Sequence, residues 1–299
     1  MNRPALLEDR QQYQRSVWAA AHHATAGGAF VHTVRVREPA REVELTVEAL
    51  PSPSYLIRTL RARTLAGVVD PRGIEGLAAL AGTAMIAGLG QRVREAVGSG
   101  RGADLLRDAM IEAARLTRQV GCLPRERVEQ GVASGARGFW QLDREGWIDL
   151  PDSCFTYSEA GAALLATRAV AAAATPDLYC SRPGQLRVFE RHKVAELAIE
   201  GARLRLAHSM HDNVHGFEVV YEIELASGRF VRAESVTPRL PYAGICSEPQ
   251  GKVRALLGET LDAGLAKRIQ AHLGGVTGCA QLYDLTADLL KLAAAPRVC

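Results

Sequence analysis

The sequence predicts an α+β protein built from an internally duplicated unit, in which an antiparallel sheet is followed by helices, with a helical insertion between the two copies. The first observation is a repeat: residues 80–116 align with residues 256–292 without a gap and are identical at 11 of 37 positions. The second is that, in each copy, alternating apolar and polar residues precede residues with helical spacing. We therefore expect two units related by a pseudo-twofold axis.

The N-terminal repeat, residues 1–118, has predicted strands between residues 30 and 62. VHTVRVRE, EVELTVEAL and SYLIRTLRAR alternate apolar and polar residues, and Pro-Ser-Pro at 51–53 marks a turn. Apolar residues at intervals of three and four then predict helices over 73–80, 83–97 and 103–118, with glycines between them.

Residues 119–185 have no counterpart in the second copy and form the helical insertion. They contain two of the three tryptophans, Trp140 and Trp147, and an alanine-rich stretch at 160–174 that predicts a packed helix. In one interpretation the segment is a linker that packs the two units together. In the other, FWQLDREGW and CFTYSE form a lid or wall of a binding pocket, where the two tryptophans contact a substrate.

The C-terminal repeat, residues 186–299, follows the same order as the first. LRVFERHKVAELAIE, GARLRLAH and FEVVYEIELASGRFVRAESV predict strands, the last of them a hairpin that turns at Ser227 and Gly228. Helical spacing predicts helices over 248–257, 260–273 and 279–294.

Composition argues against several classes of protein. A net charge of +3, from 36 basic and 33 acidic residues without a basic run, disfavours nucleic-acid binding. The first residues are too charged for a signal peptide, and no stretch is apolar enough to span a bilayer, so we expect a cytoplasmic protein that binds no membrane. In such a protein the six cysteines are expected to be thiols or ligands rather than disulfides.

Motifs for nucleotide cofactors are missing from the sequence. It has no GxGxxG after a strand, no GxxxxGK[ST], no GxSxG and no HExxH. The glycines of GGVTGC at 274–279 could suit an anion, but the first copy keeps glycines at 98 and 102 without a nearby cysteine. Their shared role is therefore predicted to be backbone geometry.

Three of the eight histidines, His208, His211 and His215, lie within eight residues immediately before a predicted strand. Neutral imidazoles suit either metal binding or acid/base catalysis near neutral pH, with Asp212 fixing a tautomer. A solvated polar loop with hydrogen-bonded histidines is the third interpretation.

Two cysteines of the second copy are predicted at helix starts. Cys246 follows Tyr242 at a strand-to-helix turn, and a helix N-terminus lowers the pKa of a thiol, so we expect a reactive thiolate there. Cys279 begins the last predicted helix and is followed by Gln281. The first copy has unreactive or different residues at the positions of His215, Tyr242, Cys246 and Cys279, namely Pro39, Ala66, Asp70 and Ala103. We therefore predict one site per chain, in the C-terminal repeat.

The segments HGFEVVYEIEL, FVRAESVTPRLPYAGIC and LLGETLDAGLAKRIQAHLGGVTGCAQLYDL resemble the bacterial domain-of-unknown-function family 2889 over about residues 185–292. That family has a histidine before a strand, a cysteine after Pro-Tyr, and Gly-Cys-Thr-His-Leu. Here Ala280 and Gln281 replace the threonine and the histidine. A weaker likeness, in order and spacing, is to the iron-sulfur cluster assembly scaffold fold. It implies that His215, Cys246 and Cys279 converge and, with Asp212 or Gln281, hold zinc or iron.

These features favour a carbon–carbon lyase that uses acid/base chemistry, without a nucleotide cofactor, on a small apolar or aromatic molecule. Retro-aldol loss of formaldehyde from a lignin-derived aromatic, in aromatic-compound catabolism, is one example. The alternatives are a metal or iron-sulfur carrier without catalysis and a partner-binding protein, and a homodimer is expected for a small enzyme. The catalytic candidates are His208, His211, Asp212, His215, Tyr242 and Cys246, and the substrate-binding candidates are Trp140, Trp147 and Gln281.

Overall fold

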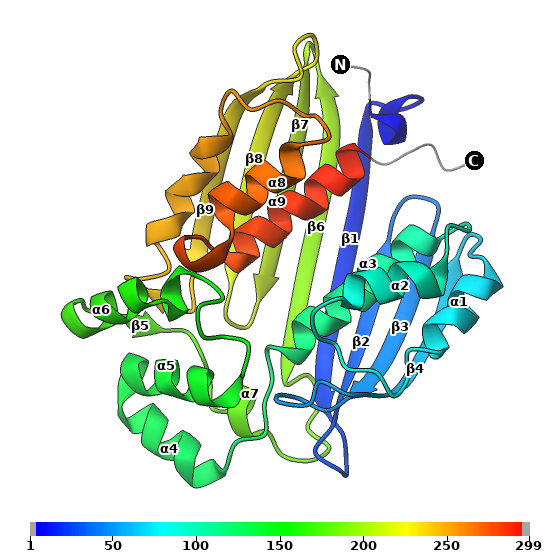
Figure 1. Cartoon of the computed structure of the whole chain (residues 1–299). Helices are drawn as coiled ribbons and strands as arrows, with labels where there is room; N and C mark the ends of the chain where they lie inside the picture. The colour runs from blue at the N-terminus through cyan, green and yellow to red at the C-terminus, as the bar shows by residue number, and fades with distance from the viewer. Residues whose placement is uncertain (1–3, 295–299) are drawn as a thin grey trace.

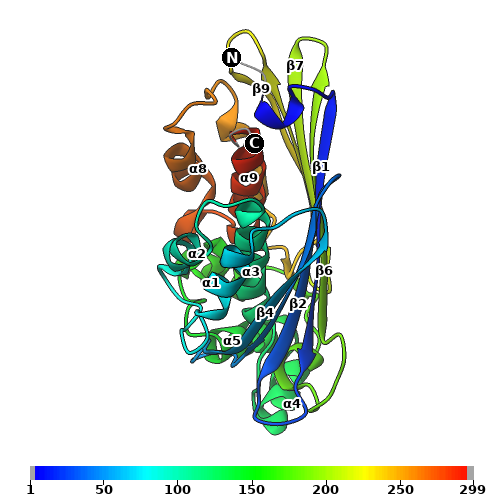
Figure 2. The same ribbon diagram turned by 90° about the vertical axis from the view of Figure 1, so that its right-hand side faces the viewer.

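The computed structural model describes residues 4–294 and has the predicted α+β composition, with helices packed on one face of an eight-stranded antiparallel sheet (Figures 1 and 2). The strand order is β4-β3-β2-β1-β6-β7-β8-β9. The first four strands along the chain are β1 (Gln12–His23), β2 (Phe30–Arg37), β3 (Glu42–Ala49) and β4 (Ile57–Ala66). The other four are β6 (Phe189–Glu200), β7 (Arg203–Asp212), β8 (Gly216–Glu224) and β9 (Phe230–Arg239). Antiparallel pairing of β1 with β6 joins the halves into one sheet.

Each half of the sheet carries its own helices on the same face. In the N-terminal half these are α1 (Pro71–Ala78), α2 (Leu89–Val97) and α3 (Ala103–Thr117). In the C-terminal half they are η3 (Glu248–Leu256), α8 (Leu265–Leu273) and α9 (Ala280–Ala293), with short 3-10 turns η1 (Ala5–Leu7) and η4 (Gly275–Thr277) elsewhere. Both halves therefore have the same order of elements, and α2 and α8 coincide at the offset of 176 residues found in the repeat. A common origin of the halves stays a prediction.

The strand β1 is not predicted by the sequence pattern. It contains Ala19, Ala20 and Ala21 followed by two histidines, so the alternation of apolar and polar residues is lost there. The strand forms because both of its edges are paired, to β2 on one side and to β6 on the other. Alanine suits this central position because all three of these side chains are fully buried.

The insertion forms a separate group of short elements beside the C-terminal half (Figure 1). They are α4 (Arg125–Ala133), α5 (Gly135–Gly146), η2 (Phe155–Tyr157), α6 (Glu159–Thr167), β5 (Ala171–Ala172) and α7 (Asp177–Cys180), and β5 pairs with β10 (Tyr242–Ala243). The expectation of a packed helix over 160–174 is correct only in part. The helix α6 ends at Thr167, and within it Gly161 is buried and Ala162, Leu164 and Leu165 pack half-buried against the core.

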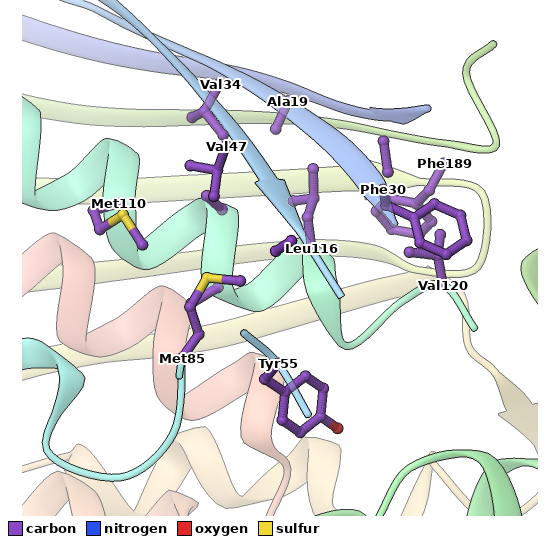
Figure 3. Close-up of a cluster of buried hydrophobic side chains, with 14 of the residues drawn as sticks. Ala19, Phe30, Val34, Val47, Tyr55, Met85, Met110, Leu116, Val120 and Phe189 are labelled. Atoms are coloured by element: carbon purple, nitrogen blue, oxygen red, sulfur yellow. The ribbon is translucent and has the colours of Figure 1, made fainter. Parts of the chain in front are cut away.

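Apolar side chains fill the space between the sheet and the helices. In the N-terminal half, Val34 and Val47 of the sheet lie near Met110 and Leu116 of α3, with Met85 beside them (Figure 3). A second apolar cluster lies between β6–β9 and the helices η3, α8 and α9. No helix among residues 4–294 is long and apolar enough to cross a membrane.

A network of buried ion pairs lies where the two halves meet. Arg191 on β6 is 1% exposed and contacts Asp212 at 2.7 Å and Glu112 of α3 at 3.1 Å. The Nζ atom of Lys193, two residues further along β6, lies 3.1 Å from Glu112 and 2.9 Å from Asp288 of α9. The two halves are therefore connected by charge as well as by strand pairing.

The network continues between α3 and α9, which lie side by side over the central strands (Figures 1 and 2). Arg115 of α3 contacts Asp284 of α9 at 2.8 Å, and Lys291 of α9 contacts Asp108 of α3 at 3.2 Å. Asp108 also accepts from Arg15 of β1 at 2.7 Å. Arg15 and Arg115 are largely buried, and unpaired buried charges are costly, so the contacts of these two arginines fix the helices against the sheet.

Replacing Glu112 with alanine is expected to lower the free energy of unfolding by about 3 kcal/mol, because Arg191 and Lys193 each lose a buried partner. Equilibrium urea unfolding measures the change. Glu145→Ala is the control, since the ion pair of Glu145 with Arg127 is exposed and its loss should leave stability unchanged. Equal stability of the Glu112→Ala variant and the wild type would contradict the prediction.

Glu112 also makes the free energy of unfolding depend on pH. Burial alone would raise the pKa of Glu112, but Lys193, Arg191 and Arg115 lower it from 4.5 to about 2. A carboxyl whose folded pKa is lowered stabilises the fold above its unfolded pKa and loses that effect as pH falls through the folded value. The wild type should therefore lose stability between pH 4.5 and pH 2 more steeply than Glu112→Gln in urea unfolding at a series of pH values. Parallel curves would show that Glu112 is not responsible.

Candidate active site

A cavity of about 140 Å³ lies between the insertion and the C-terminal half. Its walls come from α5, η2 and α7 of the insertion, from the β7–β8 turn, from the segment after β9 and from the start of α9. Most of the lining is apolar or aromatic, including Trp147 and Phe217. The FWQLDREGW and CFTYSE segments both contribute to the wall, which is the arrangement expected under the second interpretation of the insertion.

His215 lines the cavity and is held by Asp212. The tight turn between β7 and β8 lets the Asp212 carboxylate accept from the backbone N–H groups of Val214 at 2.8 Å and His215 at 2.6 Å. The Nδ1 atom of His215 lies 3.0 Å from the same carboxylate. This contact assigns the Nδ1 proton to the Asp212 side and leaves Nε2 as the ring nitrogen for acid/base chemistry.

Asp212 is kept ionised by its surroundings. Burial would raise the pKa of its carboxyl group, but His215 and Arg191 lower it well below its ordinary value. The Nε atom of Arg191 donates to Asp212 at 2.8 Å, and Arg191 in turn contacts Glu112 of α3. The histidine at the cavity is therefore oriented by a carboxylate that the buried ion network holds in place.

A second carboxylate, Asp143 of α5, lines the same cavity and accepts from three phenols. The hydroxyl groups of Tyr157 and Tyr179 donate to it, both at 2.7 Å, and the hydroxyl of Tyr242 donates as well. Burial raises the pKa of Asp143 above its usual value, although the three phenols and the charge of His215 lower it in part. We call Asp143, Tyr157, Tyr179 and Tyr242 the Asp143 cluster.

Of this cluster, the sequence pattern identifies Tyr242 but not Asp143, Tyr157 or Tyr179. The available signal is the place of Asp143 in α5, where it follows Phe139 by four residues and so lies on the buried face of the helix. A carboxylate on an apolar helix face requires partners. The sequence alone does not identify these partners, because they lie on η2, α7 and β10.

The thiols of Cys246 and Cys279 line the cavity, but neither is the reactive thiolate that the sequence suggests for Cys246. Cys246 precedes a 3-10 helix that starts at Glu248, and burial raises its pKa to about 12. Its Sγ atom lies 3.0 Å from the Thr156 hydroxyl. Cys279 does cap α9, yet burial raises its pKa to about 11. Burial outweighs any effect of a helix N-terminus at both thiols.

The remaining predicted residues divide between the cavity and other places. Trp147 and Gln281 line the cavity, and their role in substrate binding stays a prediction. His208 does not, because its Nδ1 atom lies 2.9 Å from the Leu285 carbonyl of α9. His211 is exposed and pairs with Glu218 at 3.5 Å. The indole of Trp140 donates to the Thr156 carbonyl at 2.9 Å, behind the cavity wall.

No three His, Cys, Asp or Glu side chains within residues 4–294 are grouped so that they could hold a metal ion. His215, Cys246 and Cys279 line one cavity but do not form a coordination set. The geometry therefore does not favour the zinc or iron site that the scaffold likeness implies.

Arg118, at the end of α3, is the Arg or Lys side chain among the described lining residues. Each of its three side-chain nitrogens donates one hydrogen bond within the protein. The Nε atom donates to Asp149 at 2.5 Å, and the two terminal nitrogens donate to the Ala114 and Met85 carbonyls, both at 2.9 Å. Three of the five guanidinium donors are thus used within the protein.

Residues 193–295 match the model of a family described as Protein of unknown function (DUF2889), which confirms the resemblance of the C-terminal part to that family. The match includes Asp212, His215, Tyr242 and Cys246, whereas Asp143 lies before it. Comparisons with curated proteins and with solved structures gave no match. The likeness to the iron-sulfur scaffold fold stays a prediction.

The raised pKa values predict how the cysteines react. At pH 8 iodoacetamide should modify the exposed Cys122 before Cys246 and Cys279, because Cys246 is buried, Cys279 is half-buried, and the raised pKa of each keeps the thiol protonated. Mass spectrometry of peptides after timed labelling measures the order. Labelling of Cys246 ahead of Cys122 would mean that it is a thiolate after all.

Proposed function

We propose that this chain is a lyase that cleaves a carbon–carbon bond of a small, uncharged aromatic alcohol by acid/base chemistry, without a nucleotide cofactor. The observation that carries this proposal is the pairing of His215 with Asp212 at the wall of an aromatic cavity. An imidazole fixed by a buried carboxylate is a common proton acceptor in enzymes.

The size and lining of the cavity support an aromatic substrate. Its volume of about 140 Å³ is close to the roughly 150 Å³ of a protein cavity that binds benzene. Trp147 and Tyr179 meet edge to face at 5.4 Å, and Tyr157 and Tyr242 do so at 6.3 Å, so aromatic edges and faces surround the space. Arg118 uses three of its five N–H donors within the protein, which leaves less of the guanidinium group for a charged ligand.

The proposed reaction needs one group that accepts a proton and one that donates it. Nε2 of His215 takes the proton from the substrate hydroxyl. The oxygen then forms a carbonyl while the neighbouring carbon–carbon bond breaks, and the electron pair stays on the departing carbon. The Tyr242 hydroxyl, at the cavity wall, supplies a proton to that carbon. The loss of formaldehyde from a primary alcohol is one reaction of this type.

The test is a screen of uncharged aromatic alcohols in which the carbonyl product is measured. For any alcohol that the wild type cleaves, His215→Ala should lower kcat/KM by about 100-fold or more, because the proton acceptor is lost. His211→Ala is the matched control, since His211 precedes the same turn but is exposed and outside the cavity. Equal rates for the His215→Ala variant and the wild type would remove His215 from the reaction.

A further inference from the structure

Asp143 sits in an unusual environment for an aspartate. Its side chain is buried on α5, and the groups that act on it come from η2 (Tyr157), α7 (Tyr179), β10 (Tyr242) and the β7–β8 turn (His215). None of these is a positively charged Arg or Lys that would hold the carboxyl group ionised. Asp212, by contrast, is paired with the buried Arg191.

Asp212 and Asp143 therefore differ in pKa, as the base and the acid of one active site do. Their environments push the two pKa values apart: that of Asp212 is lowered, and that of Asp143 is raised by burial. Asp212 remains a carboxylate that orients His215. Asp143 is the group able to carry a proton at a pH where ordinary aspartates have lost theirs.

Hydrogen bonding in the Asp143 cluster gives that proton a route to a ligand. While Asp143 is ionised, all three phenols donate to it. Once it is protonated, the carboxyl group itself donates one hydrogen bond, and the phenol that accepts it is free to turn its own O–H toward the cavity. All three phenols line that cavity, so any donated proton is replaced from Asp143.

We propose that Asp143 is the proton reservoir of this site and that Tyr242 passes its proton to the ligand. This inference rests on the proposed lyase function and names the source of the second proton. As the carbon–carbon bond breaks, the substrate hydroxyl proton moves to His215, the phenol proton of Tyr242 moves to the departing carbon, and the Asp143 proton moves to the Tyr242 oxygen. Exchange with solvent then returns a proton to Asp143 and removes one from His215.

The first arm of the test needs no substrate. Infrared difference spectra of the whole chain, taken while pH is raised from 4 to 8, should show the C=O stretch of a protonated carboxyl group that persists above the ordinary range of aspartate. The band should be missing in Asp143→Asn and present in Asp149→Asn. Asp149 is the matched control because it also accepts from a phenol, that of Tyr55 at 2.6 Å, but lies outside the cavity lining.

The second arm uses an aromatic alcohol that the wild type cleaves. Asp143→Asn and Tyr242→Phe should each lower kcat by about 100-fold with little change in KM, whereas Glu145→Gln should keep the wild-type rate, because Glu145 lies on α5 but outside the cavity lining. The wild-type rate should fall as pH rises through the raised pKa of Asp143, because Asp143 then loses its proton. This fall should be absent in Asp143→Asn. Thermal unfolding of each variant checks that it is folded.

The outcomes separate this inference from the lyase proposal. Identical infrared spectra of the wild type and Asp143→Asn would overturn the reservoir, as would wild-type turnover and pH profile in the Asp143→Asn variant. If the wild type cleaves no aromatic alcohol, the lyase proposal is wrong, while the infrared band still decides whether Asp143 stores a proton.

Discussion

The buried ion network at the junction of the two halves is the constraint on which the rest of the structure depends. Arg191 and Lys193 extend from the central strand β6 into the space under α3 and α9, where water cannot solvate them. The fold must then supply carboxylates there, and Glu112 and Asp288 do so from the two helices. Apolar residues in these places could be equally stable, but buried charges accept few alternative arrangements, so they fix how the helices sit on the sheet.

The network is nearly symmetric between the two halves, but only the C-terminal half uses it to position a cavity residue. The contact of Arg115 with Asp284 and that of Lys291 with Asp108 occupy equivalent places in the two halves, 176 residues apart. Arg191, however, also reaches Asp212, which orients His215, whereas Arg15 contacts carboxylates of its own half. The N-terminal half thus supports His215 through Glu112 and adds Arg118 to the cavity lining, although it has other residues at the positions of His215, Tyr242, Cys246 and Cys279.

Structural features that depend on neighbouring residues could be predicted from the sequence. Features that depend on residues far away in the sequence could not. The hairpin around Gly228 and the helix Leu265–Leu273 follow from local turn residues and helical spacing. The strand Gln12–His23 follows from pairing on both edges, which its alanines do not signal. At the site, His215 and Tyr242 can be predicted from their residue types and sequence positions. Asp143 cannot, because the three phenols that donate to it lie on separate elements. The expectation for Cys246 failed because burial, invisible in sequence, decides its pKa.

The two ends of the insertion lie close together. Backbone hydrogen bonds from Gly121 to Leu178 and from Leu123 to Tyr179 bring its two ends together beside the sheet. The stretch between them supplies Asp143 and Trp147, and it lies wholly outside the matched region of residues 193–295, which holds His215. Asp143 and His215 are therefore encoded in separate segments of the gene, and both segments are needed to complete the lining of the cavity. A substitution between residues 124 and 177 can thus change the wall of the cavity without changing the β7–β8 turn that holds His215.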